Sequence, residues 1–496
     1  MIGEDLPALI VVLPLLGAVV APLLGRGGAP WTLASIVTAV VLVLSAALLG
    51  RVLDSGPVSY ALGGWAPPIG IEYRVDRLNA LVLLIVAIIS TIVTLYARLS
   101  VAHEIAPERI RFFYSTYLMC IAGLLGITIT GDAFNLYVLL EISSISTYVL
   151  VALGRQPQAL RASLNYLVLG TIGATFLLIG IGYLYLATGT LNMADLGARL
   201  GNLSDNRTVR SGFAFIIVGA SLKLALFPLH AWLPNAYAYA PSAVTALLAA
   251  TATKVGAYIL IRFLFTIFGV ELSFTTLHAD TVILVAASVA VIVGSLIAIR
   301  EGNVKRMLAY SSIAQIGYIA LGIAFVSVTG LAAAILHLFN HALMKGALFL
   351  ALGCIAYRVG SVEIASLHGL ARRMPWTFAA FVLAGLSLIG VPLTTGFVSK
   401  WYLLRAALEE GWWPIAVLIV VGSLLALIYV WRVVEVAYFR PLPATSRRVR
   451  EAPFALLAPT WALVATNVYF GIDTRLAVDT ATQAAAGLLR VAGAAP

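Results

Sequence analysis

Lysine is the residue whose placement in this chain suggests chemistry. Of the five lysines, Lys305 falls in a predicted loop, and the other four lie inside apolar runs: Lys223, Lys254, Lys345 and Lys400. A lysine near the centre of a membrane helix costs roughly 3 kcal/mol to insert. Unlike arginine, it can lose its proton near neutral pH when it is removed from water. A row of such lysines therefore indicates a proton pathway.

Some of these cations have a simpler interpretation, as anchors. A long basic side chain near a helix end extends to the membrane surface and keeps its charge in water. This alternative is strongest for Lys400 and Arg262, whereas Lys223 and Lys254 lie well inside their predicted spans.

One carboxylate matches the lysines in depth. Glu141 lies inside the apolar span that begins at Ala133. A buried glutamate must be neutral or paired. Lys223 is the nearest mid-span cation in the same half of the chain, so we expect the two to interact. The alternative is a static structural ion pair.

Two histidines and a lysine share a helix face. His337, His341 and Lys345 are spaced at i, i+4 and i+8, which places them on one side of a helix. Imidazoles exchange protons near pH 7. Two histidines at this spacing could also bind zinc, but no carboxylate or cysteine completes such a site and Lys345 would repel the ion. We expect no metal and no cofactor, because the chain shows no nucleotide loop, no cluster cysteines and no haem motif.

The composition places all these groups in a membrane. Apolar types make up 61% of the 496 residues and charged types only 10%, against about 25% charged residues in soluble domains. This excludes a soluble enzyme, a disordered chain and a secreted disulfide scaffold. Windows of about 20 apolar residues predict about fourteen transmembrane helices, which begin near Leu6, Trp31, Leu78, Phe112, Ala133, Leu160, Ser211, Pro241, Thr281, Val304, Gly330, Pro375, Trp412 and Phe454.

The basic loop residues predict the orientation. Glu4 and Asp5 precede the first apolar run, where a signal peptide would carry positive charge, so we expect that run to remain as a span. Arginines concentrate in alternate loops, which would be cytoplasmic. Both termini are then expected outside. The net charge of +10 belongs to these loops and does not indicate nucleic-acid binding.

Two predicted helices are broken. Pro228 and Pro234 interrupt the seventh, while Pro392 and Gly396 interrupt the twelfth. Discontinuous helices in corresponding positions indicate inverted repeats with an ion site between them, although two ordinary proline kinks are an alternative. The single membrane domain, 1–496, is then divided into the ranges 1–111 (helices 1–3), 112–268 (first repeat), 278–438 (second repeat) and 439–496 (helix 14 and tail).

Three stretches resemble a known family. The range 301–318, EGNVKRMLAYSSIAQIGY, is very close to a family signature. The range 337–349, HLFNHALMKGALF, and the range 222–234 with the following Lys254 match two more. The chain is similar, over roughly residues 75–440, to the antiporter-like subunits shared by Mrp-type cation/proton antiporters, respiratory complex I and membrane-bound hydrogenases.

The resemblance implies a fold and a set of roles. The family fold is all-α, with fourteen helices and two inverted five-helix repeats, each containing a broken helix. Glu141 and Lys223 would be its paired charges and Lys254 its central proton carrier. The helix with His337, His341 and Lys345 would connect the halves, and Lys400 would be the terminal carrier. Lysine at this last position, the length, and the lack of a long lateral helix resemble the D subunits of Mrp antiporters most. The stretch 395–402, TGFVSKWY, departs from the commonest version of its motif.

The expected function is proton translocation within a multisubunit Na⁺/H⁺ antiporter. Its partners would be other membrane subunits, protons, Na⁺ and the lipid of a bacterial or archaeal cell membrane. The alternative within the family is a proton-pumping subunit of a complex I-like or hydrogenase-type redox complex. An inert membrane scaffold and a solute permease are interpretations of other classes. The buried charges count against the first, and the lack of an evident substrate pocket against the second.

Overall fold

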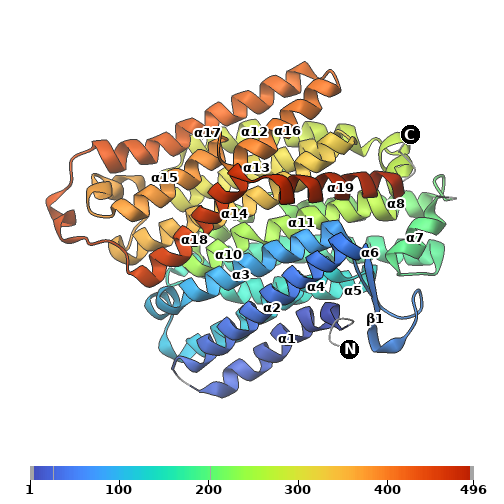
Figure 1. Cartoon of the computed structure of the whole chain (residues 1–496), viewed down its shortest axis with the longest axis horizontal. Helices are drawn as coiled ribbons and strands as arrows, with labels where there is room; N and C mark the ends of the chain where they lie inside the picture. Colours follow the sequence, from blue (N-terminus) through green and yellow to red (C-terminus); the bar gives the residue numbers. More distant parts are fainter. Residues whose placement is uncertain (1–4, 26, 202, 492–496) are drawn as a thin grey trace.

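The computed structural model describes residues 5–25, 27–201 and 203–491, so Glu4 lies outside the described residues. They form a bundle of roughly aligned helices (Figure 1). Three helices come first, with a small hairpin before the third. The bounds are α1 Leu6–Val20, α2 Ala29–Ser55, β1 Val58–Ala61, β2 Glu72–Val75 and α3 Arg77–Glu104. The hairpin is antiparallel, pairs Val58 with Val75, and lies between the second and third predicted spans.

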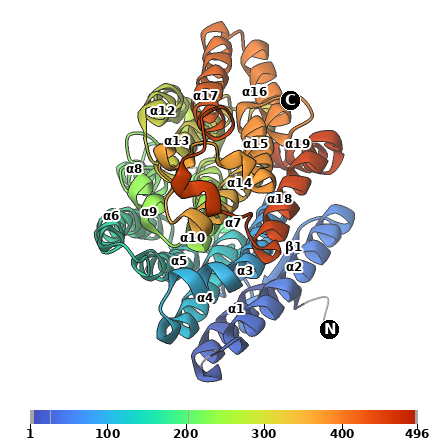
Figure 2. The same ribbon diagram turned by 90° about the vertical axis from the view of Figure 1, so that its left-hand side faces the viewer.

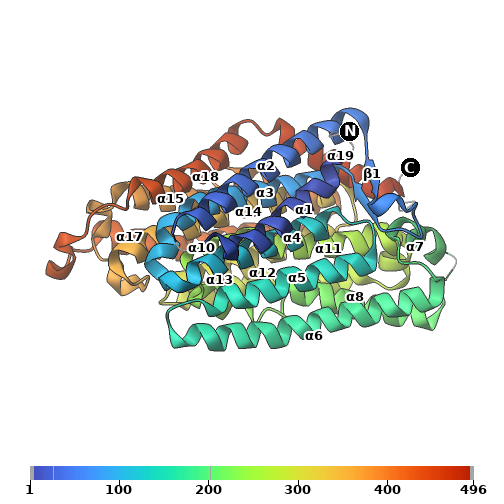
Figure 3. The same cartoon turned by 90° about the horizontal axis from the view of Figure 1, so that it is seen from below.

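The first half of the remaining chain contains an interrupted helix. Its elements are α4 Ile110–Ile129, α5 Ala133–Ala152, α6 Pro157–Thr188, α7 Met193–Leu200, α8 Arg207–Leu224, α9 Leu233–Tyr239, α10 Ser242–Ala250, α11 Ala252–Ile261, and the π-helices η4 Arg262–Ile267 and η5 Glu271–Thr276. Helices α6 and α8 run side by side along one edge of the bundle (Figure 3). The break between α8 and α9 contains Pro228, as predicted from the sequence.

The second half contains the other interrupted helix. Its elements are α12 Ala279–Arg300, α13 Val304–Ala324, α14 Val328–Val359, α15 Pro375–Ile389, α16 Thr395–Glu409 and α17 Trp413–Phe439, and two helices follow, α18 Phe454–Ile472 and α19 Arg475–Val491. The break between α15 and α16 contains Pro392. Both predicted interruptions are therefore confirmed, although Pro234 and Gly396 lie in the first turns of α9 and α16 and not in the breaks themselves.

Twelve helices among the described residues are long and apolar enough to cross a membrane. The other two predicted spans are the seventh and the twelfth, which contain the breaks, so the total of fourteen stays a prediction. The predicted C-terminal tail instead forms α19, which packs against α3 and α14. The protein is a multi-pass membrane protein that is nearly all helical.

The two halves run in opposite directions. Asp132, just after α4, bridges to Asn192 before α7, so α4 ends where α7 lies. We call this end of the bundle, which also carries the hairpin, the α7 end (Figure 1). Helix α12 starts at the α7 end, because it follows η4 and η5 and η4 packs on α7. Hence α4 and α12 have opposite orientations, as inverted repeats require.

Helix α14 is the centre of the bundle (Figure 2). Ser327 caps its N-terminus by accepting a hydrogen bond from Gly330. All its side chains from Gly330 to Ile355 are buried, and it contacts α3 and α10 as well as α13, α15 and α16. A helix that is apolar and buried all round belongs to the core of a large bundle. Polar groups on α14 are therefore held away from lipid and between the two halves.

Candidate functional site

Lys400 lies at the break between α15 and α16. The last carbonyls of a helix have no partner within that helix. Lys400 Nζ donates to two of them, the carbonyl oxygens of Leu388 and Ile389, both at 3.0 Å. It also donates to Ser423 Oγ on α17 at 3.1 Å. The side chain is buried and points into the protein, which does not fit the anchor interpretation.

His337 is connected to the residue next to Lys400. Its Nδ1 lies 2.9 Å from Ser399 Oγ, and its Nε2 lies 3.0 Å from Gln315 Oε1. Ser399 belongs to α16 and Gln315 to α13. The imidazole therefore joins three helices through hydrogen bonds.

Lys345 lies two turns further along α14. Its Nζ donates to the carbonyl oxygen of Leu308 at 2.7 Å and to Ser311 Oγ. Ser311 and Gln315 are four residues apart on α13 and share one face. The polar face of α13 thus lies beside both Lys345 and His337.

His341 lies between these two groups on α14. Its ring stacks on that of His337, with centroids 6.0 Å apart. Both ring nitrogens are buried and have no hydrogen-bond partner among the described residues. Lys254, Lys345 and Lys400 are all close enough to act on it electrostatically. An imidazole with both nitrogens free is able to accept and to donate a proton.

Lys254 lies at a third helix interruption, which the sequence did not predict. Thr251 leaves the helical conformation, with φ −126° and ψ −54°, and separates α10 from α11. Lys254 Nζ donates to the carbonyl oxygen of Ala249 and to Thr253 Oγ1, the latter at 3.4 Å. The buried lysine therefore takes up a carbonyl beside the break.

Lys223 and Glu141 do not form the direct ion pair that the sequence suggested. Lys223, in the last turn of α8, donates instead to Ser144 Oγ at 2.5 Å. Ser144 lies one turn after Glu141 on α5, and Glu141 Oε1 has no partner among the described residues. Glu141 still acts electrostatically on Lys223. Ser144 contacts Lys223 directly because Lys223 approaches α5 one turn beyond Glu141.

Three further basic residues have partners that the sequence did not reveal. Lys305, which falls in the first turn of α13 rather than in a loop, is buried and donates to Ala240 O and Ser242 Oγ. Arg262 forms an ion pair with Asp76 at 2.6 Å. Arg432 donates to the carbonyl oxygens of Ile299 and Glu301 at the end of α12. The uncharged partners Ser311, Gln315 and Ser399 were also missed, although the first two lie inside the signature 301–318.

Comparisons with known proteins identify the family of this chain. The family model for the NADH:quinone oxidoreductase/Mrp antiporter transmembrane region matches residues 130–426. The chain belongs to this family.

Its relatives include a subunit of a redox complex and a subunit of an antiporter. It is 41% identical over 493 residues to the N subunit of the NADH-quinone oxidoreductase of Desulforudis audaxviator, covering 96% of this chain and 98% of that protein. It is 33% identical over 452 residues to the D subunit of the Na⁺/H⁺ antiporter of Bacillus subtilis, covering 91% and 90%. Among solved structures, a chain of the Mrp complex from Dietzia sp. DQ12-45-1b superposes with a TM-score of 0.91 at 29% identity, covering 99% of this chain and 98% of that one.

Proposed function

We propose that this chain is the proton-translocating subunit of a multisubunit Na⁺/H⁺ antiporter, an ion transporter rather than a catalytic enzyme. One observation carries the proposal: Lys345, Ser311, Gln315, His337, Ser399 and Lys400 form a buried polar run across α13, α14 and α16. Intramembrane ionisable groups of this kind mark ion pathways. A scaffold has no use for them, since each costs insertion energy.

His337 has the geometry of a proton relay. With the oxygen of Gln315 facing it, Nε2 carries the hydrogen and donates, while Nδ1 accepts from the Ser399 hydroxyl. A proton passed to Nδ1 through the Ser399 hydroxyl makes the ring cationic, and the ring becomes neutral again when Nε2 releases its own proton on the Gln315 side. His341 and Lys254 continue this line toward the first half, where Glu141 sets the charge of Lys223.

The proposed residue roles divide between the two halves of the chain. We assign residues 112–268 to a first repeat and 278–438 to a second, between 1–111 and 439–496. Lys223 and Lys254 serve the first repeat and Lys400 the second, while His337, His341 and Lys345 connect them. Support comes from the opposite orientations of α4 and α12 and from one proline break in each half.

The partners follow from the relatives. The Bacillus subtilis protein is named a Na⁺/H⁺ antiporter subunit, and the Dietzia chain comes from a complex. We therefore assign Na⁺ and protons as transported ions and other membrane subunits as partners. Arginine-rich alternate loops support a topology with both termini outside, in a bacterial or archaeal cell membrane.

A matched pair of serines tests the proposal in everted vesicles that carry the assembled complex. Ser311 contacts Lys345, whereas its neighbour Ser312 donates only to its own helix at Leu308. Ser311→Ala should lower Na⁺-driven proton exchange about fivefold, because a lost buried hydrogen bond is worth about 1 kcal/mol. Ser312→Ala should exchange ions like the wild type. Equal rates in both variants would contradict the proposal.

A second function is favoured by one relative. The 41% identity to the N subunit of an NADH-quinone oxidoreductase supports a proton-pumping membrane subunit of a redox complex. Both functions use the same buried run, so the chain's own residues do not separate them. Purification of the native complex and identification of its subunits does: quinone- or hydrogenase-type subunits indicate the redox complex, and small antiporter subunits the antiporter.

A further inference from the structure

A large cavity lies at the α7 end of the bundle, away from the buried run. Its volume is about 550 Å³. Its walls are the start of α3, helix α7, η4 and the last turns of α19. Ala194 and Ala198 on α7 line it and are exposed at the surface. The cavity is therefore open to its side of the membrane.

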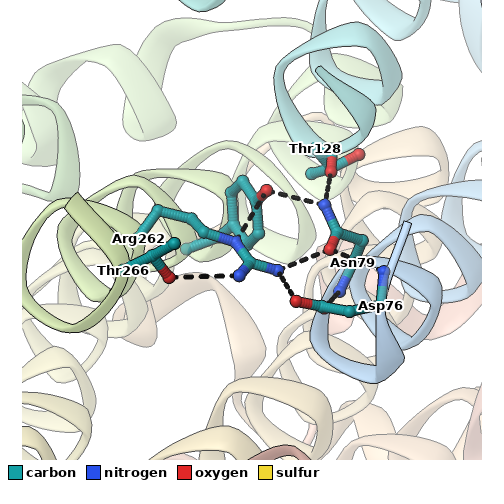
Figure 4. A network of polar contacts seen from close by, with 6 residues as sticks. Asp76, Asn79, Thr128, Arg262 and Thr266 are labelled. Carbon is teal, nitrogen blue, oxygen red and sulfur yellow. Dashed lines mark hydrogen bonds and ion pairs between the residues drawn. The ribbon is translucent and has the colours of Figure 1, made fainter. Parts of the chain in front are cut away.

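The inner wall of the cavity is a closed network around Arg262 (Figure 4). The guanidinium donates to Asp76 Oδ2 at 2.6 Å and to Asn79 Oδ1 at 2.5 Å. It also donates to Thr266 Oγ1 and to Tyr258 OH, both at 3.2 Å. The Arg262 side chain is only 7% exposed. A buried arginine keeps its charge at all usable pH values, so this group is a fixed cation and not a proton carrier.

One helix face leads from the network to the buried run. Lys254, Tyr258 and Arg262 follow one another at i, i+4 and i+8 along α11 and its end, so they share a face. Tyr258 and Arg262 line the cavity. Lys254 is thus one helical turn behind the cavity wall, where its Nζ is bound to the carbonyl oxygen of Ala249.

The Tyr258 hydroxyl is blocked in this state. A hydroxyl has one hydrogen to donate and two lone pairs with which to accept. Asn79 Nδ2 donates to it at 2.8 Å and Arg262 Nε at 3.2 Å, so both lone pairs are occupied. A proton can pass through a hydroxyl only if the oxygen accepts one as it gives up its own. Arg262 would have to withdraw from Tyr258 to free a lone pair, and the ion pair with Asp76 holds it in place.

We propose that the cavity is an aqueous vestibule through which Lys254 exchanges protons with the α7 side of the membrane, and that the Asp76–Arg262 ion pair is its gate. In the open state the Lys254 side chain leaves the Ala249 carbonyl and gives its proton to Tyr258, which passes its own to water in the cavity. In the closed state Arg262 prevents a continuous leak across the membrane. This inference rests on the proposed proton translocation and adds its access route.

Charge-removing variants test the gate in proteoliposomes that hold the assembled complex. Arg262→Gln and Asp76→Asn each break the ion pair, and asparagine keeps the helix cap of α3. With Na⁺ absent and a K⁺ diffusion potential imposed, an internal pH dye should report a proton leak about tenfold above wild type, the factor that corresponds to 1.4 kcal/mol. Arg199→Gln, which breaks the exposed Arg199–Asp195 pair on α7, should leave the leak unchanged. A wild-type leak in both gate variants overturns the gate.

Cysteine modification tests the vestibule without disturbing the network. The native Cys120 and Cys354 are fully buried, so an introduced cysteine is the reactive one. A membrane-impermeant trimethylammonium thiosulfonate applied to Ala198→Cys should remove most of the ion exchange of the same sample before treatment. Ser211→Cys, exposed at the start of α8 but outside the cavity, should keep its exchange. Full exchange after modification at residue 198 overturns the vestibule. If the wild-type complex exchanges no ions, the proposed function fails, while the leak measurement still tests the gate.

Discussion

Replacing Lys400 with arginine separates a proton carrier from a static charge. The carbonyls of Leu388 and Ile389 and the hydroxyl of Ser423 hold the lysine amine, and they accept hydrogen bonds equally well from a guanidinium. We therefore expect Lys400→Arg to insert and assemble normally. The side chain would load a proton but never release it. With a pKa above about 12, no more than about one arginine in ten thousand is neutral at pH 8. Exchange should fall to the background of empty membranes.

The assay is Na⁺-driven proton exchange in everted vesicles, with the amount of complex measured in the same membranes. Lys305→Arg is the matched control, since Lys305 is also buried and bound to a carbonyl and a hydroxyl but lies outside the polar run. It should retain most of the exchange. If Lys400→Arg exchanges ions at the wild-type rate, Lys400 is a structural cation and the carrier role is wrong.

Three further variants follow from the same geometry. Glu141→Ala should abolish exchange without loss of insertion, because Lys223 would lose its only nearby carboxylate among the described residues; wild-type exchange in vesicles would exclude a role for this charge. Ser144→Ala should slow exchange about fivefold, since it removes a hydrogen bond to Lys223 worth about 1 kcal/mol, and the neighbouring Ser143→Ala serves as the control. Ser399→Ala leaves His337 Nδ1 unpartnered, so it should lower the exchange rate and reduce the free energy of unfolding by about 1–3 kcal/mol. An unchanged melting temperature of the purified complex would contradict this.

The buried charges could be predicted from the sequence because they are conspicuous. A lysine or glutamate inside an apolar run is costly enough to require a reason, and proline marks a helix break directly. Both predicted breaks are present in the structure for that reason. The residues that complete the site are a different matter. Ser311, Gln315 and Ser399 are uncharged and inexpensive in a helix, so nothing in their spacing distinguished them from ordinary helix residues.

Long-range contacts and features without a local sequence signal could not be predicted from the sequence either. Asp76 and Arg262 are separated by 186 positions, and only the packed bundle brings α3 and α11 together. The interruption at Thr251 involves neither proline nor glycine, so no local signal predicted it. Helix α19 was missed because it is rich in alanine and too polar on one face to resemble a span; its other face, with Ala481, Ala485 and Leu489, is buried in the bundle.

Three of the buried lysines share one feature with a mechanical consequence. Lys254, Lys345 and Lys400 each rest on a backbone carbonyl oxygen instead of a carboxylate. An ammonium has three hydrogens to donate, and Lys400 uses all three, whereas a neutral amine has two. Each departing proton therefore forces Lys400 to release one oxygen, and two of its three oxygens belong to the end of α15. The position of that helix end is then coupled to the protonation of Lys400. Loss of the proton would move the end of α15, and a neighbouring subunit in contact with it could respond to that movement.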